Sequence, residues 1–251
     1  MPTTTPPYPG IRVLLEQGRV VPFLGSGASI VPSATEDGRV EAGGPPLPSA
    51  MELSRRLSTL SGLGPASVCD VSLMQAAQYV EISLGPDFLH DRLRDIFVPM
   101  RAWGGLHDFL ATCGGIRLIV TTNYDTLIER AFRHHERPYH VIVHETRQEH
   151  VQLWRHGDDT PTLSPCNEVD LDLDSDRTPV IYKIHGSVSL RDPELDSFVI
   201  TEDHYHEFLA RMVTKEAIPK GLGHVLQASH LLFLGYGLGD WNLRVLLHSI
   251  W

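Results

Sequence analysis

The clearest indication of the fold lies near the start of the chain, in Val20-Val21-Pro22-Phe23-Leu24-Gly25-Ser26-Gly27-Ala28-Ser29. Its first half is a short apolar run, which is typical of a buried strand when turn residues bound it. Its second half is a polar loop with two glycines. Glycine lacks a Cβ atom, so such a loop lets backbone N–H groups approach a phosphate, although a plain strand-to-helix turn explains it equally well. The stretch therefore predicts a buried strand that ends in a loop at the edge of a sheet.

The same arrangement recurs three times farther along the chain. Apolar runs at residues 117–120, 180–182 and 231–234 lead into three more polar loops: Thr121-Thr122-Asn123-Tyr124-Asp125, Lys183-Ile184-His185-Gly186-Ser187 and Gly235-Tyr236-Gly237-Leu238-Gly239-Asp240. In an open parallel sheet, ligands bind outside the carboxyl ends of the strands. We therefore expect the four loops to meet along one edge of the sheet.

Strand and helix patterns alternate along the chain, which predicts an α/β fold: a Rossmann-like parallel sheet flanked by helices. Residues 45–113 carry helix signals, such as a capping box at Ser49 and Glu52, and no convincing strand. We therefore expect a single domain over residues 1–251. Its sheet core would comprise about residues 11–30 and 114–251, with an inserted helical module at about residues 45–113.

Two further segments are less regular. Residues 144–178 are polar and rich in Asp, which predicts a solvated loop; calcium binding is the alternative, but the EF-hand glycine and terminal Glu are missing. The last helical pattern, residues 241–250, reaches Trp251 without a glycine or polar stop signal. This favours the N-terminal part of a longer protein, with a frayed natural terminus as the alternative.

The composition argues against several classes of protein. Hydrophobic residues make up 42% of the chain, enough for a real core, and the formal net charge of −10 argues against a nucleic-acid surface. The apolar runs are far too short to span a membrane, and the N-terminus has no apolar signal core. We therefore expect a cytoplasmic protein without membrane or direct nucleic-acid binding.

The cysteines and histidines do not form a metal-binding pattern. Cys69, Cys113 and Cys166 are scattered and include no C-x-x-C pair, which is typical of reduced thiols. The 14 histidines lack the spaced His, Cys and carboxylate pattern of tight sites. We therefore expect no metal site.

Three polar side chains in the loops have both a structural and a chemical interpretation. Asn123 and Asp125 follow a strand and precede a helix, where both residue types cap helices well. His185 lies between an apolar strand and Gly186, a place where many histidines are structural. Its unperturbed pKa of about 6.5 also suits a general base near neutral pH.

Taken together, these loops resemble the sirtuin family, most closely its bacterial sirtuin-like branch of NAD-consuming defence domains. Residues 25–29 look like the sirtuin phosphate loop G-A-G-x-S, and residues 121–125 are similar to T-Q-N-x-D. His185-Gly186 matches the catalytic H-G pair, and residues 235–240 take the place of the later glycine loop. The motifs occur in family order, and the resemblance spans about residues 20–245.

The resemblance implies a role for each matched residue. Asn123 would contact the nicotinamide ribose and help to place a nucleophile, Asp125 would hold the nicotinamide carboxamide, and His185 would be the general base on the ribose hydroxyls. The other matched residues would line the dinucleotide, the first loop at the diphosphate and the late loop on the adenosine side: Gly25, Ser26, Gly27, Ala28, Ser29, Thr122, Gly235, Tyr236 and Gly237.

The chain also departs from the sirtuins that deacylate proteins. Three scattered cysteines cannot build their four-cysteine zinc module, Thr122 replaces their usual Gln, and we find no segment that would clamp an acyl-lysine peptide. The resemblance with these departures favours a hydrolase that cleaves NAD⁺ to nicotinamide and ADP-ribose. It implies no cofactor beyond NAD as the substrate, and no zinc.

Three other functions stay open. The first is NAD-dependent protein deacylation or ADP-ribosyl transfer, and the second is a non-catalytic dinucleotide-binding assembly module. A hydride-transfer enzyme ranks last, because its acidic residue would fall in a Gly/Pro-rich stretch where Glu41 is a poor candidate. The resemblance further implies an anti-phage effector that depletes NAD, gated as a homo-oligomer or by a fused or separate sensor module.

Overall fold

The computed structural model describes residues 8–30, 46–62, 71–146, 150–169, 171, 177–213 and 218–237. Within these residues the helices are α1 (Tyr8–Glu16), α2 (Ala50–Leu60), α3 (Leu73–Leu84), α4 (Pro86–Phe97), α5 (Gly105–Thr112), α6 (Leu127–His134), α7 (Glu202–Val213) and α8 (Lys220–Ala228). The strands are β1 (Val20–Leu24), β2 (Leu118–Thr121), β3 (His140–His144), β4 (His150–Trp154), β5 (Thr162–Pro165), β6 (Val180–Lys183), β7 (Gly186–Ser187), β8 (Ser197–Phe198) and β9 (His230–Leu234).

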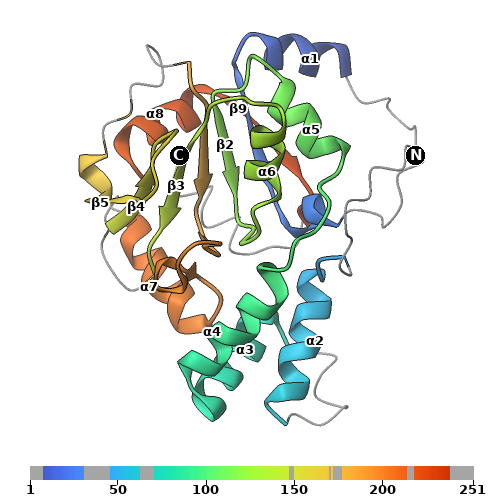
Figure 1. Ribbon diagram of the computed structural model, residues 1–251, viewed down its shortest axis with the longest axis vertical. Coiled ribbons are helices and arrows are strands. Elements are labelled where there is room, and N and C mark those ends of the chain that lie inside the picture. Colours follow the sequence, from blue (N-terminus) through green and yellow to red (C-terminus); the bar gives the residue numbers. More distant parts are fainter. Residues whose placement is uncertain are drawn as a thin grey trace.

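The main sheet has seven strands in the order β5-β4-β3-β6-β2-β1-β9 (Figure 1). Strands β3, β6, β2, β1 and β9 pair in parallel, while β4 and β5 add an antiparallel edge. The β7–β8 pair forms a separate small sheet. This architecture confirms the predicted Rossmann-like α/β fold.

Helices cover both faces of the main sheet, because each strand sends alternate side chains to opposite faces. In β1, Val21 and Phe23 join a core with α7 and α8, whereas Val20 and Leu24 join a core with α1, α5 and α6. All five residues of this strand are buried. The continuous apolar run Val20–Leu24 therefore reflects a strand packed on both sides.

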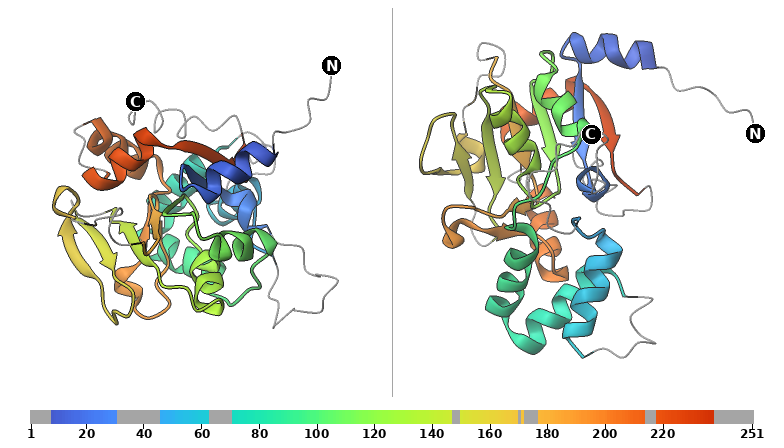
Figure 2. Two further views of the ribbon diagram at one scale, coloured as in Figure 1. Left: turned by 90° about the horizontal axis from the view of Figure 1, so that it is seen from above. Right: turned by 45° about the vertical axis from the view of Figure 1, so that its right-hand side comes forward.

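The helices α2, α3 and α4 lie together beyond the sheet edge to which β2 and β3 point (Figures 1 and 2). Apolar side chains of these helices, such as Leu57 and Leu93, share a core with Tyr124 from the loop after β2 and Phe198 of β8. Helix α5 belongs instead to the core beneath α6. The three-helix unit therefore packs directly on the loops at the carboxyl ends of the strands.

The prediction of a solvated loop over residues 144–178 is wrong for β4 and β5. Val151 and Leu153 of β4 are fully or nearly fully buried against the α7–α8 core, so this hairpin extends the sheet. A five-residue apolar alternation inside a polar region is too short a signal to outweigh the composition. In the Asp-rich run, residues 170 and 172–176 lie outside the described residues, as does the predicted final helix at residues 241–250.

None of the helices among the described residues has the length and apolar character needed to cross a membrane.

Candidate functional site

The strand registers bring the four loops to one edge of the sheet. Leu24 at the end of β1 pairs with Thr121 of β2 and with Leu234 of β9, and Thr121 pairs with Lys183 of β6. These four residues therefore lie side by side across the sheet, and a polar loop begins directly after or at each of them. The predicted convergence of the loops is confirmed as far as residue 237, since Leu238, Gly239 and Asp240 lie outside the described residues.

The first and last glycine loops pack against each other through their backbones. Gly25 N–H donates to Leu234 O and Gly27 N–H to Gly235 O, each at 2.9 Å. A Cβ atom on Gly27 would lie 2.9 Å from Gly235 Cα, so the loops meet with no space for a side chain. Ala28 N–H donates to Gly25 O within a short 3-10 turn, Ser26–Ser29. In this arrangement three N–H groups of the predicted phosphate cradle have backbone partners, and phosphate binding stays a prediction.

Replacing Gly235 with Ala should destabilise the protein by roughly 2–4 kcal/mol, through left-handed backbone strain and overpacking. Gly235 has a φ of +75°, and an added Cβ would lie 2.1 Å from Ala28 N. Denaturant unfolding measures the change. The matched control is Gly237→Ala, where no heavy atom within the described residues lies within 4 Å of the added Cβ. Equal destabilisation by the two substitutions would contradict the packing argument.

Asn123, Ser29 and Asp125 form one hydrogen-bond network between the first glycine loop and the loop after β2. Asn123 Nδ2 donates to Gly25 O at 2.9 Å and to Ser29 Oγ at 2.8 Å. Ser29 Oγ in turn donates to Asp125 Oδ2 at 2.7 Å. Ser29 and Asp125 are buried, whereas Asn123 is partly exposed. The network leaves Asn123 as the member most open to a ligand.

Asp125, which precedes the N-cap residue Thr126, forms a side-chain hydrogen bond to the start of α6, and Asn123 does not. Asp125 Oδ1 accepts a hydrogen bond from Leu127 N–H, the first residue of α6, at 3.0 Å. The side chain of Asn123 donates to the glycine loop instead. The Asp125 carboxylate therefore has a structural use at both oxygens in this arrangement, and its role toward a carboxamide stays a prediction.

Tyr236 connects the late glycine loop to the loop after β2. Its hydroxyl lies 3.0 Å from Thr122 Oγ1, and its ring packs on Phe23 and Phe233. The ring also lies beside Gly25, where an added Cβ would come within 3.0 Å of it. Thr122 and Tyr236, both predicted to line the dinucleotide, are thus in direct contact.

His185 lies apart from this network, on the α7 side of the sheet edge. Its ring packs edge-on against Tyr205 and Phe208 of α7, and Nδ1 lies 3.4 Å from Tyr205 Oη. Among the described residues its ring forms no hydrogen bond to Asn123, Ser29 or Asp125. His185 is 7% exposed, and burial lowers its pKa to about 3. Burial thus keeps the imidazole neutral, as a general base requires, but weakens it as a proton acceptor.

The stability of the protein should fall as the pH drops below about 6.5, because buried histidines must bind protons on unfolding. Burial lowers the pKa of His185 to about 3, and burial together with the nearby Arg211 and His185 lowers the pKa of His144 to about 3. Above pH 6.5 neither state is protonated; between pH 6.5 and 3 only the unfolded state is, at a cost of about 1.4 kcal/mol per pH unit for each group. Chemical denaturation from pH 7.5 to 4.5 measures this slope. His144→Leu should reduce it, and a slope unchanged by His144→Leu would contradict the assignment.

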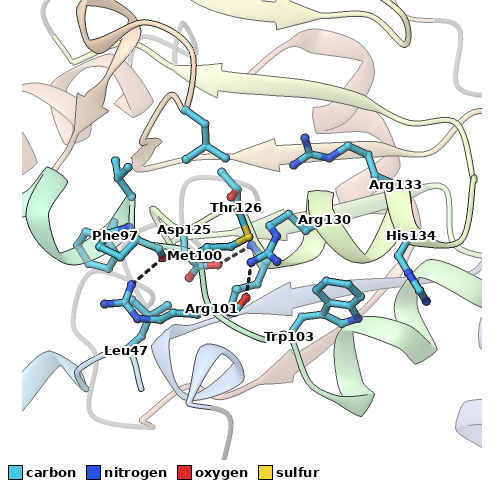
Figure 3. A pocket seen from close by; sticks show the side chains of 14 residues that line it. Leu47, Phe97, Met100, Arg101, Trp103, Asp125, Thr126, Arg130, Arg133 and His134 are labelled. Atoms are coloured by element: carbon cyan, nitrogen blue, oxygen red, sulfur yellow. Dashed lines mark hydrogen bonds between the residues drawn. The ribbon is translucent and has the colours of Figure 1, made fainter. Parts of the chain in front are cut away.

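A cavity of about 560 Å³ opens between the start of α6 and the segment that connects α4 to α5 (Figure 3). It touches the predicted site residues at Asp125 alone. Its volume lies in the range of small-molecule pockets. Its polar lining includes three arginines and an indole that the sequence analysis did not single out: Arg101, Trp103, Arg130 and Arg133.

The sequence gives little indication that these arginines line one cavity. Arg130 and Arg133 are three apart on α6, so they share a face of that helix, beside the buried stripe that includes Ala131. Arg101 lies in the segment between α4 and α5, where no helical or strand pattern of hydrophobic residues predicts the direction of its side chain. Its guanidinium donates to the carbonyls of Ile96 and Pro99, and burial lowers its pKa.

The described part of the chain contains no group of three or more His, Cys, Asp and Glu side chains arranged to hold a metal ion. Cys113 and Cys166 are free thiols there, and Cys69 lies outside the described residues. The expectation that no zinc is needed stays a prediction.

The parallel sheet, with four loops at the carboxyl ends of its strands and helices on both faces, defines a Rossmann-like α/β protein. Residues 117–251, more than half of the chain, match the family model of the SIR2-like domain, and the chain belongs to this family. The matched region contains the loops of Asn123, His185 and Gly235. The predicted sirtuin resemblance is thereby confirmed.

The chain is also similar to the NAD(+) hydrolase ThsA of Acinetobacter baumannii (strain 532279). The two sequences are 29% identical over 185 residues, which make up 72% of this chain and 32% of that protein. This chain therefore matches about a third of the length of that curated relative.

Proposed function

We propose that this chain hydrolyses NAD⁺ to nicotinamide and ADP-ribose. The observation that supports this most is the network of Asn123, Ser29 and Asp125, which joins the first glycine loop to the loop after β2 at the carboxyl edge of the sheet. The similarity to a protein named as an NAD(+) hydrolase supports the same reaction. NAD depletion in anti-phage defence belongs to this proposal and rests on the resemblance alone. A cytoplasmic location also belongs to it, as an expectation from the sequence pattern.

The proposed reaction breaks the bond between C1′ of the ribose and the nicotinamide nitrogen. The bonding electrons leave with nicotinamide, which becomes neutral, and an oxocarbenium-like ribose develops. A water oxygen then bonds to C1′, and its proton passes to a base and on to solvent. Asn123 would orient the ribose and the water, because an interaction formed with the reacting centre is worth most in the transition state.

His185 would act on the ribose hydroxyls in this proposal. Its neutral imidazole can accept a proton, and its position two residues beyond β6 holds it at the same sheet edge as Asn123. In the described arrangement it is buried by Tyr205 and Phe208. We therefore propose a rearrangement of this region before catalysis, which would raise the solvent exposure and the pKa of His185.

We propose that assembly controls this rearrangement. Two observations support the proposal that the described arrangement is an inactive state. Three N–H groups of the first glycine loop have backbone partners, and His185 is buried. The three-helix unit α2–α4 packs on Tyr124 of the loop after β2 and on Val188, three residues beyond His185, and through them could transmit a contact with another copy or a sensor module. NAD turnover per subunit should then rise with protein concentration.

Product analysis in H₂¹⁸O tests the proposed reaction. Purified protein is incubated with NAD⁺ and an acetyl-lysine peptide, with and without a chelator. Hydrolysis predicts free nicotinamide and ADP-ribose that carries one ¹⁸O at C1′, whether or not the peptide or the chelator is present. Acetylated ADP-ribose would establish deacylation instead, and ADP-ribose attached to protein would establish transfer. Binding of NAD⁺ without products at any protein concentration would favour the non-catalytic module.

A further inference from the structure

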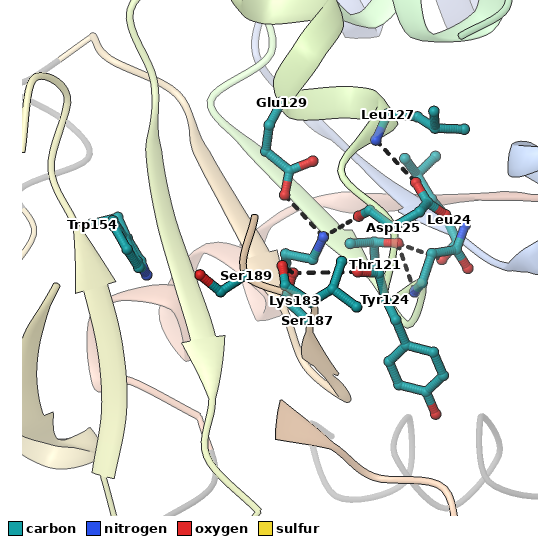
Figure 4. A network of polar contacts seen from close by, with 12 residues as sticks. Leu24, Thr121, Tyr124, Asp125, Leu127, Glu129, Trp154, Lys183, Ser187 and Ser189 are labelled. Carbon is teal, nitrogen blue, oxygen red and sulfur yellow. Dashed lines mark hydrogen bonds and ion pairs between the residues drawn. The ribbon is translucent and has the colours of Figure 1, made fainter. Parts of the chain in front are cut away.

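A buried cation lies behind the loop that carries Asn123. Lys183, the last residue of β6, is fully buried (0% exposed). Its Nζ forms an ion pair with Glu129 Oε1 at 2.9 Å and donates a hydrogen bond to the backbone carbonyl of Asp125 (Figure 4). None of the roles proposed above uses Lys183 or Glu129.

The Lys183–Glu129 pair lies between two parts of the proposed site: the end of β6 that leads to His185 and the loop that carries Asn123. Ile181 of β6 points into the core beneath α6, and Lys183, two residues on, points to the same side. Glu129 is a buried residue in the first turn of α6, and its side chain reaches Lys183 of the sheet. Lys183 precedes His185 by two residues, and Asp125 follows Asn123 by two. One ammonium group therefore connects the strand end that leads to His185 with the loop of Asn123.

Burial of the Lys183–Glu129 ion pair carries a desolvation penalty that is large for a contact between two segments of the chain. Burying an ammonium and a carboxylate costs several kcal/mol per ion, and well-packed apolar residues often serve stability as well or better. Backbone bonds already join these segments, from Ile184 N–H to Thr121 O and from Val188 N–H to Tyr124 O, each at 3.0 Å. Glu129 Oε2 is buried without a hydrogen-bond partner among the described residues. Stability alone does not account for this arrangement.

What the ammonium adds is a fixed orientation for the peptide unit of Asp125. The charge-assisted hydrogen bond from Lys183 Nζ to the Asp125 carbonyl fixes this peptide unit on the side that faces β6. The carboxylate of the same residue accepts from Ser29 Oγ and from Leu127 N–H. Ser29 Oγ in turn accepts from Asn123 Nδ2 at 2.8 Å. A turn of the Asp125 peptide would therefore displace Asn123 through two successive hydrogen bonds.

We propose that Lys183 and Glu129 are positioning residues, which hold the loop of Asn123 in the geometry needed for NAD cleavage without touching the substrate. This inference rests on the proposed function. Because misplacement by about 1 Å can cost 10²-fold in rate, we expect removal of the ammonium to lower kcat by roughly 10- to 100-fold. The dissociation constant for NAD should change little, since in this proposal neither residue contacts the dinucleotide.

Three variants test this proposal: Lys183→Met, Glu129→Gln and the double variant Lys183→Met/Glu129→Leu. Each single change leaves a buried group without its partner, so both should lower the melting temperature as well as kcat. The double variant removes both charges and should recover most of the melting temperature. If the pair positions the loop, the double variant stays slow despite its restored stability. A double variant with parental melting temperature and parental kcat would overturn the proposal.

Amide hydrogen exchange provides a readout that does not depend on NAD cleavage. The Leu127 amide, which donates to Asp125 Oδ1, should exchange faster in the double variant than in the parent protein. An unchanged exchange rate at this amide would overturn the positioning role. Failure of the parent protein to release nicotinamide would overturn the proposed function instead, while the exchange measurement would still decide whether Lys183 holds the loop.

Discussion

Replacing His185 with Gln should lower the rate of NAD cleavage by roughly 10²- to 10⁴-fold, the usual contribution of a general acid–base group. Gln retains much of the volume and hydrogen-bonding capacity of His but does not titrate near neutral pH. The structure favours Gln over Ala for this test, because the imidazole packs between Tyr205 and Phe208 and Ala would leave a cavity. Nicotinamide release and thermal melting are measured on the same preparation.

The matched control for this prediction is His144→Gln. His144 is buried like His185, packs on Phe208 as well, and has its pKa lowered to about 3 by burial and by its neighbours Arg211 and His185. It belongs to none of the matched family motifs, so His144→Gln should keep most of the activity. Equal losses of activity in the two variants would assign the effect to packing around Phe208. Parental activity in His185→Gln would remove His185 from the mechanism.

Replacing Asn123 with Ala should lower kcat by roughly 10²- to 10³-fold, as expected when an orienting contact of the transition state is lost. The affinity for NAD should fall much less. The change also removes hydrogen bonds to Gly25 and Ser29, with an expected loss of about 1–2 kcal/mol in the free energy of unfolding. Steady-state kinetics, NAD titration and denaturant unfolding separate the three quantities.

Ser29→Ala is the comparison that distinguishes a direct role of Asn123 from an indirect one. It breaks the link from Asn123 to Asp125 but keeps the amide of Asn123 and its bond to Gly25. If Asn123 acts on the ribose itself, Asn123→Ala should be at least about tenfold slower than Ser29→Ala. Equal rates in the two variants would assign Asn123 a purely structural role in the loop.

The sheet edge could be predicted from the sequence because its signals are local. Each buried parallel strand is a short apolar run, and each run ends in a loop with glycine or a polar residue. The rule that ligands bind at the carboxyl ends then brings Gly25, Thr122, His185 and Gly235 to one edge without any knowledge of tertiary contacts. The hairpin of β4 and β5 is not apparent from the sequence, because only Val151 and Leu153 of β4 are buried against α7 and α8, while β5 is exposed or only partly buried and the segment is polar overall.

The detailed chemistry of the edge could not be predicted, since it depends on contacts between distant segments. Ser29 and Asp125 are 96 residues apart in sequence, and Lys183 and Glu129 are 54 apart. The glycine loops predict close approach to a phosphate, which stays a prediction, but their sequence does not reveal that the first and last loops pack on each other. The burial of His185 depends on the rings of α7, and nothing near His185 in the sequence signals that packing.

The most direct test of the proposed NAD hydrolysis follows the conversion of NAD⁺ by proton NMR across a series of protein concentrations. The parent protein is compared with the double variant Asn123→Ala/His185→Gln, purified identically. We predict equal amounts of nicotinamide and ADP-ribose from the parent protein and intact NAD⁺ with the double variant. Intact NAD⁺ with the parent protein at every concentration, despite measurable binding, would contradict NAD hydrolysis by this domain. Equal turnover by the double variant would contradict the assignment of the reaction to the Asn123 and His185 loops.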